Sequence, residues 1–240
     1  MNLFYVLPKI GLRLLTLFNL VQDMEDLRNF NIHDLFCLIG KSDEEFLEWL
    51  REKLIWTTRF CECGKEMSQL HNKDNKWPVW RCYSRKNHEG KQPTKGYFDG
   101  TFFAGAHLSP KQVFEFTYYW ARKTHSQDEF QHDMGIGCPQ TVVDCSTVCG
   151  LVNCQLSIGQ LSTVCVTTLI EFKNKETGQH TNTIESQWQK FKQDHKQRYG
   201  TNRGLLNSYM EEFLWRKKFG GKDIFYHFWT QVTENYKIDT

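Results

Sequence analysis

The stretch Cys61–His88 has the sequence CECGKEMSQLHNKDNKWPVWRCYSRKNH. Two cysteines lie one residue apart at its start, Cys61 and Cys63, and Cys82 follows, with His88 at the end. Thiolates separated by an insert the length of a hairpin are the ligands of a tetrahedral zinc ribbon. We therefore predict that these four residues bind a structural Zn²⁺.

Two features of the stretch leave the metal site open to another interpretation. The usual knuckle of a zinc ribbon is C-x2-C, whereas this one is C-x-C followed by Gly64. His88 is the best-placed fourth ligand, but it is the least defined of the four. The alternative is a ribbon that has lost its metal and keeps Cys61 and Cys63 as free thiols.

Basic residues surround the cysteines, and aromatic residues lie between them. This pattern is typical of a surface that faces phosphates, although it also fits an ordinary solvated hairpin. We expect DNA contacts from Arg81, Arg85 and Lys86. The surrounding basic residues are Lys65, Lys73, Lys76, Arg81, Arg85, Lys86, Lys91 and Lys95, and the interleaved aromatic residues are Trp77, Trp80 and Tyr83.

The composition is that of a globular chain. The 240 residues are 40% hydrophobic, the mean hydropathy is −0.58, and the net charge is only +2. Nine cysteines are an odd number, which argues against a fully paired disulfide framework and favours a reducing compartment. The apolar N-terminus is interrupted by Pro8, Lys9 and Arg13, so we predict an amphipathic helix from Pro8 to about Asp23, with a targeting segment as the alternative, and no membrane partner.

Helix start signals recur on both sides of the cysteine stretch. Phe30–Ile55 is predicted to form two short helices, with Ser42 and Glu45 as a capping box. Another helix begins at Pro110, for which Ser109 is a favourable N-cap.

Two more helices are predicted after this one. The first is Gln127–Met134. The second opens at Pro139, contains the expected DNA-reading residues Gln140–Cys149 and ends at Gly150. Two helices joined by a tight glycine turn match a helix-turn-helix. The last helix has no Lys or Arg, so phosphate contacts would come from Arg122, Lys123 and His125. The alternative is a small packing unit without DNA contact.

The segment His180–Lys192, HTNTIESQWQKFK, carries a second pattern. Glu185 and Lys192 are almost two helical turns apart and share one face. An acid and a base on one face suit a site that holds a divalent metal together with a phosphate. The alternative is a surface helix with ordinary charges.

The blocks TGQHTNTIESQWQKFK and GTNRGLLNSYMEEFLWRKKFG closely resemble the C-terminal end of Merlin-type DDE transposases, eukaryotic relatives of bacterial ISXO-like transposases. The resemblance continues, more weakly, back to about Asp43. It implies that Glu185 is the last acid of the catalytic triad and that Lys192 is the basic residue following it. It also implies an RNase H-like catalytic sheet that uses Mg²⁺.

Most of that catalytic sheet is missing. Only Leu151–Gln179 joins the helix-turn-helix to the HTNTIE block, and this segment contains no aspartate. A two-metal site needs several converging carboxylates. We therefore predict a truncated core in which Glu185 and Lys192 are vestigial.

We expect an α+β, mostly helical chain. Its divisions are N-terminal helices (1–56), a zinc-ribbon-like segment (57–105), helix-turn-helix-like helices (106–150), a truncated junction (151–179) and a C-terminal remnant of the RNase H-like domain (180–240). The leading hypothesis is an inactive, transposon-derived, nuclear protein that binds DNA. A homo-oligomer is a further open alternative for its partners. The alternatives are an active transposase whose true transcript includes the sheet, and a protein-interaction module without DNA contact.

The truncation predicts that this chain neither cleaves nor joins DNA. Glu185→Gln should leave DNA binding and stability nearly unchanged, because one carboxylate cannot hold two metal ions. A strand-transfer assay with Mg²⁺ or Mn²⁺ measures the activity. Products that form with the natural chain and vanish with Glu185→Gln would contradict the truncation.

Overall fold

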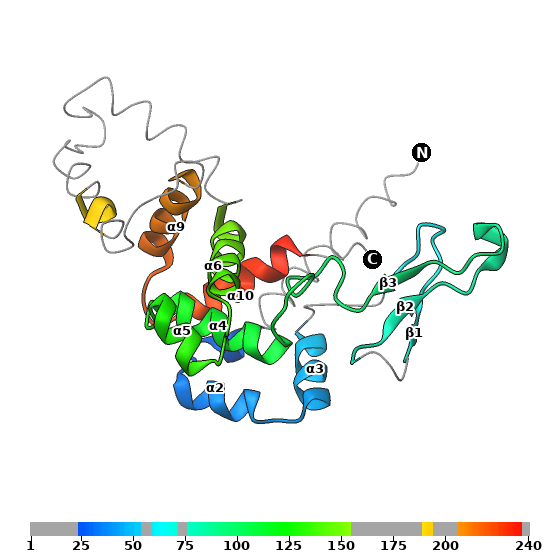
Figure 1. Cartoon of the computed structure of the whole chain (residues 1–240), viewed down its shortest axis with the longest axis horizontal. Coiled ribbons are helices and arrows are strands. Elements are labelled where there is room, and N and C mark those ends of the chain that lie inside the picture. Colours follow the sequence, from blue (N-terminus) through cyan, green and yellow to red (C-terminus); the bar gives the residue numbers. More distant parts are fainter. Residues whose placement is uncertain (1–23, 54–58, 72–75, 155–188, 194–205, 237–240) are drawn as a thin grey trace, which may run out of the picture.

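The structure is a computed structural model that describes residues 24–53, 59–71, 76–154, 189–193 and 206–236. It is mostly helical with one small antiparallel sheet, as the α+β prediction requires (Figure 1). None of the described helices is long and apolar enough to cross a membrane. The predicted helix from Pro8 to Asp23 and the residue Glu185 lie outside the described residues.

The elements follow in chain order. They are η1 (Glu25–Leu27), α2 (Ile32–Ile39), α3 (Asp43–Glu52), β1 (Ser68–Leu70), β2 (Val79–Arg81), η2 (Arg85–His88), β3 (Thr94–Gly96), α4 (Pro110–Arg122), α5 (Gln127–Asp133), α6 (Pro139–Cys154), α9 (Leu206–Phe219) and α10 (Ile224–Asn235).

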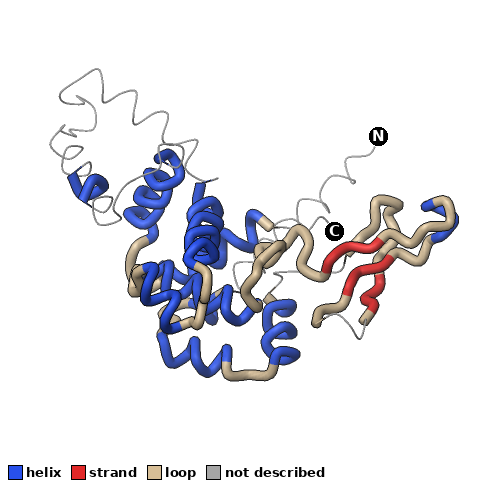
Figure 2. The backbone as a smooth tube through the Cα atoms, in the orientation of Figure 1, coloured by secondary structure: helices blue, strands red, loops and turns tan. Residues whose placement is uncertain are grey.

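The three strands form a sheet in the order β1-β2-β3, with both pairs antiparallel. Trp80, at the centre of β2, is opposite Gln69 on β1 and Lys95 on β3. We call residues 59–71 and 76–99 the sheet unit, and the described helices α2–α6, α9 and α10 the helical body. Figure 2 shows that the sheet unit lies to one side of the helical body.

Side-chain caps fix where four helices begin, because each cap satisfies backbone N–H groups that have no partner within the helix. The capping box predicted for Ser42 with Glu45 is confirmed, and so is the N-cap predicted at Ser109. Pro110 is the first residue of α4. The four boxes are Asn31 with Asp34, Ser42 with Glu45, Ser109 with Gln112, and Ser126 with Glu129.

The core of the helical body is aromatic and is centred on α4. Phe114 has no exposed surface. Five rings surround it at centroid distances of 5.0 to 6.1 Å, and they come from the segment before α2, from α3 and from α10. These rings are Phe30, Phe46, Trp49, Phe225 and Trp229. One side chain therefore joins the N-terminal helices to the C-terminal helix.

Two arginines hold the C-terminal end of α4 in place. Arg216 of α9 donates to the carbonyl oxygens of Ala121 (2.7 Å) and Trp120 (3.0 Å), and its guanidinium lies 4.2 Å from the centroid of the Trp120 ring. Its Nε is 2.7 Å from Oε1 of the buried Glu212. Arg122 donates to the carbonyl oxygens of Phe30 and Lys222.

The predicted end of the third helix at Gly150 is wrong, because α6 continues to Cys154. A glycine inside a helix costs only about 1 kcal/mol, which tertiary packing can offset. Val152 is buried against the core, and Asn235 of α10 donates to its carbonyl oxygen at 2.7 Å. The beginning of the 151–179 junction is thus helical.

The Arg216–Glu212 pair allows a test of how the helical body is stabilised. Arg216→Met should destabilise the protein by about 3–5 kcal/mol, because the buried Glu212 loses its ion pair with Arg216 and two α4 carbonyls lose their donor. Urea unfolding measures the change. Arg51→Met is the matched control, since Arg51 pairs with Glu48 at the surface, and it should leave the midpoint nearly unchanged. Equal effects of the two substitutions would contradict the assigned role of Arg216.

Candidate metal centre

The first two sulfur ligands lie on one tight turn. The N–H of Cys61 donates to the carbonyl oxygen of Lys65 (2.8 Å), and the N–H of Gly64 donates back to that of Cys61 (2.8 Å). Gly64 has φ of 75°, a left-handed conformation that glycine adopts without steric cost. This turn brings Cys61 and Cys63 to the same side although only one residue separates them.

The other two ligands lie after β2. The N–H of Cys82 donates to the carbonyl oxygen of Pro93 (3.0 Å), which holds the loop closed. The short helix η2 then carries His88 back towards Cys82. It ends at Glu89, which is left-handed, and the next residue, Gly90, also has a positive φ.

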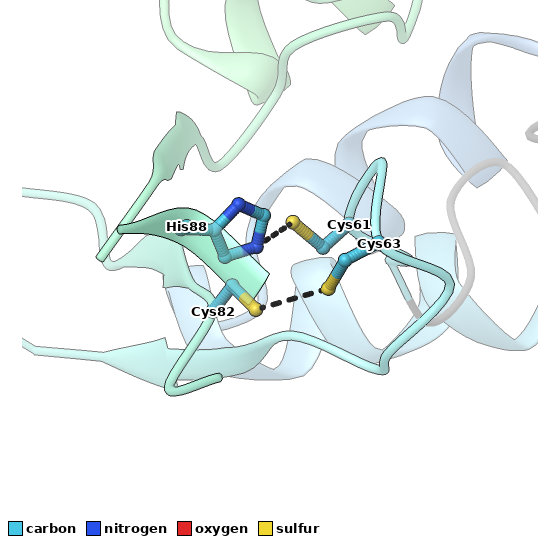
Figure 3. Close-up of side chains that lie close together, drawn as sticks. All are labelled: Cys61, Cys63, Cys82 and His88. Atoms are coloured by element: carbon cyan, nitrogen blue, oxygen red, sulfur yellow. Dashed lines mark hydrogen bonds between the residues drawn. The ribbon is translucent and has the colours of Figure 1, made fainter. Parts of the chain in front are cut away.

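The four predicted ligands converge on one point. Their ligand atoms all lie within 4.8 Å of one another, and in the described part of the chain this is the one group of at least three His, Cys, Asp or Glu residues that does so. Cys61 Sγ is 3.2 Å from His88 Nε2, and Cys63 Sγ is 3.7 Å from Cys82 Sγ (Figure 3). Tetrahedral zinc bonds require separations of about 3.5 Å between sulfur and nitrogen and about 3.8 Å between two sulfurs. The cluster therefore fits a structural zinc ion.

Hydrogen bonds already favour the charged form of one ligand. The pKa of Cys63 is lowered to about 6, first by the backbone N–H of Lys65 and then by the side chain of Asn87. The pKa of Cys82 is raised: the backbone N–H of Ser84 lowers it, but burial and the neighbouring thiols outweigh that effect. Three thiols in one place cannot all ionise without a cation between them. A divalent metal ion supplies that cation and binds thiolates directly.

The predicted DNA-binding residues separate into two groups. Arg85 and Lys86 are exposed on η2 near His88, the predicted metal ligand, and Arg81 is half-buried at the end of β2. Arg122 lies in the helical body, where its guanidinium is bound to backbone carbonyls and packs over Tyr118. Lys123 is exposed as the C-cap of α4.

The aromatic residues expected on a phosphate-facing surface differ in position. Trp80 is buried, and its indole N–H donates to the carbonyl oxygen of Tyr97 (3.1 Å), so it supports the sheet rather than facing a ligand. Tyr83 is 52% exposed. Phe60 is 41% exposed but was not among the aromatic residues predicted for this surface. Its position next to Cys61 could have indicated it.

The C-terminal pattern is described only in part. Lys192 is exposed within the helical residues 189–193, whereas its predicted companion Glu185 lies outside the described residues. Among the described residues the one metal-ligand cluster contains no carboxylate, so no site for Mg²⁺ is found there. Comparisons of the chain with protein-family models, with curated proteins and with solved structures found no match.

The cluster predicts that purified protein contains about one zinc ion per chain. Cys63→Ser should lose the metal and unfold the sheet unit, because the ion and the fold stabilise each other. Acidification should release it as well, since the thiolate ligands become protonated. Elemental analysis of reduced protein measures the metal content.

Cys138→Ser is the matched control for this experiment, because Cys138 is exposed and lies outside the cluster. It should keep the zinc. Protein that contains no zinc when purified under reducing conditions would contradict the metal centre.

Proposed function

We propose that this chain is a transposase-derived, nuclear DNA-binding protein in which zinc holds the sheet unit in shape and the sheet unit contacts phosphates. The observation that carries the proposal is the position of η2. This single turn has the metal ligand His88 at one end and the exposed cations Arg85 and Lys86 at the other. Metal binding and phosphate binding therefore depend on one piece of backbone.

Charge in the sheet unit supports this function. Residues 59–99 contain nine Lys and Arg against five Asp and Glu, a net charge of +4, although the whole chain is only +2. Zinc bound by three thiolates and a neutral histidine lowers this by one. Among the described residues Arg85, Lys86, Lys91 and Lys95 form no ion pair, which leaves them available to an anion. Cations grouped in this way bind the DNA backbone with little regard to sequence.

Catalysis is not part of the proposal. The family chemistry needs three converging acids and Mg²⁺, and the segment 151–179 supplies no aspartate. An active enzyme remains the alternative only for a chain that includes the missing sheet.

A second candidate function, protein interaction, is favoured by α6. If α4–α6 acted as a helix-turn-helix, α6 would be the DNA reader, yet it has no Lys or Arg. Its exposed residues include Val143, Val148 and Leu151, and its other side packs against α9. Apolar side chains without cations suit a protein partner better than phosphates. DNA binding is therefore assigned to the sheet unit and not to α6.

The proposal is tested with the double variant Arg85→Gln/Lys86→Gln. It should weaken DNA binding by at least tenfold in about 50 mM salt. It should also make the negative slope of log K against log salt shallower by about 1.8, because two phosphate contacts are lost. Fluorescence anisotropy with a labelled duplex measures both quantities. Zinc content checks that the fold is kept.

The matched control is Lys217→Gln/Lys218→Gln, which removes the same charge from the exposed end of α9. It should have a much smaller effect. Equal losses in the two double variants would contradict a localised site in the sheet unit, and no salt-dependent binding by the natural chain would contradict the function itself.

A further inference from the structure

Among the described residues, few aromatic side chains are exposed to solvent, and most of those are next to the cysteines of the metal cluster. The exposed aromatic residues are Phe36 on α2 and Phe60 and Tyr83 in the sheet unit. Phe60 immediately precedes Cys61, and Tyr83 immediately follows Cys82. The ligand atoms of these two cysteines lie within 4.8 Å of each other, so both rings leave the backbone beside the metal cluster.

The stability of the sheet unit does not explain the two exposed rings. Its apolar side consists of buried Met67 and of Trp80 stacked on Tyr97, with ring planes only 8° apart. Neither Phe60 nor Tyr83 makes a ring contact within the described part of the chain. Two exposed aromatic side chains, each adjacent in sequence to a cysteine of the same cluster, are typical of a binding surface.

The backbone that carries these rings is fixed by hydrogen bonds. The carbonyl oxygen of Arg59, the residue before Phe60, accepts from the N–H of Met67 at 2.8 Å. The residue after Phe60, Cys61, is held by the hydrogen bond of its own N–H to Lys65. The carbonyl oxygen of Tyr83 accepts from the N–H of Arg85 at 2.9 Å. Because the backbone that carries the rings is already ordered, less conformational entropy is lost when a flat ligand stacks on them.

We infer that Phe60 and Tyr83 form a stacking surface for unpaired nucleobases, so that the sheet unit prefers single-stranded DNA to duplex. This inference rests on the proposed function. Arg85 and Lys86, two and three residues after Tyr83, bind the backbone phosphates of the strand whose bases stack on the rings. Every base has a flat face, so such a surface tolerates any sequence.

The preference for single strands follows from access to the bases. Within a duplex each base is already stacked between its neighbours, and an aromatic side chain cannot lie on its face without unstacking it. In a single strand the faces are open. The cations attract both forms, whereas the rings contribute only to single-strand binding.

The test compares a labelled oligothymidine with a duplex hairpin of equal charge, measured by fluorescence anisotropy at one salt concentration. The natural chain should bind the single strand more tightly. Tyr83→Leu should weaken single-strand binding by about tenfold, within the range for one stacked base, and should leave duplex binding and the salt slope unchanged. Tyr83→Phe should keep single-strand binding, because it keeps the ring.

Two further variants make the outcome decisive. Phe60→Leu should act like Tyr83→Leu, and it replaces that variant in the test if the Tyr83 change lowers the zinc content. Phe36→Leu removes the exposed ring outside the sheet unit and should change nothing. Equal affinity for the two DNAs, or equal losses for both in the leucine variants, would overturn the inference while DNA binding itself stands. Binding to neither DNA would overturn the proposed function as well.

Discussion

The ring contacts of Phe114 join parts of the chain that are more than a hundred residues apart. The phenyl group of this α4 residue contacts rings of both α3 and α10, and Arg216 and Arg122 bind the end of the same helix to the segments around it. Large flat side chains bury much surface each and stabilise by contact geometry as well as area. The N-terminal and C-terminal helices therefore form one body because both need α4.

The sheet unit faces a different constraint. Its strands are three residues long, and strands of that length cannot cover a core of their own. The unit is held on one side by rings that continue from Trp77 through Phe98 and Phe103 to Trp229 in the helical body. On the other side stands the Cys₃His cluster. Small units of this kind commonly use a metal in place of a hydrophobic core.

The two parts differ in what they leave at the surface. In the helical body Arg122, which was predicted to contact DNA, instead binds the carbonyl oxygens of Phe30 and Lys222. In the sheet unit a metal ion bound by the four-residue cluster would take the place of a hydrophobic core. Arg85, Lys86 and Tyr83 of this unit are exposed.

The sequence by itself determined the features that depend on neighbouring residues. Ser42, Ser109 and Pro110 predicted helix starts correctly, and the spacing of Cys61, Cys63, Cys82 and His88 predicted that their ligand atoms converge, because capping and tight turns are local interactions. Only the tertiary structure decided the rest. Whether Gly150 ended a helix, whether Trp80 was buried and whether Arg122 was exposed depended on partners such as Asn235, Tyr97 and Lys222, which are close in space but distant in sequence. Local sequence patterns do not predict those partners, because the burial of a side chain depends on what packs against it and not on its neighbours along the chain.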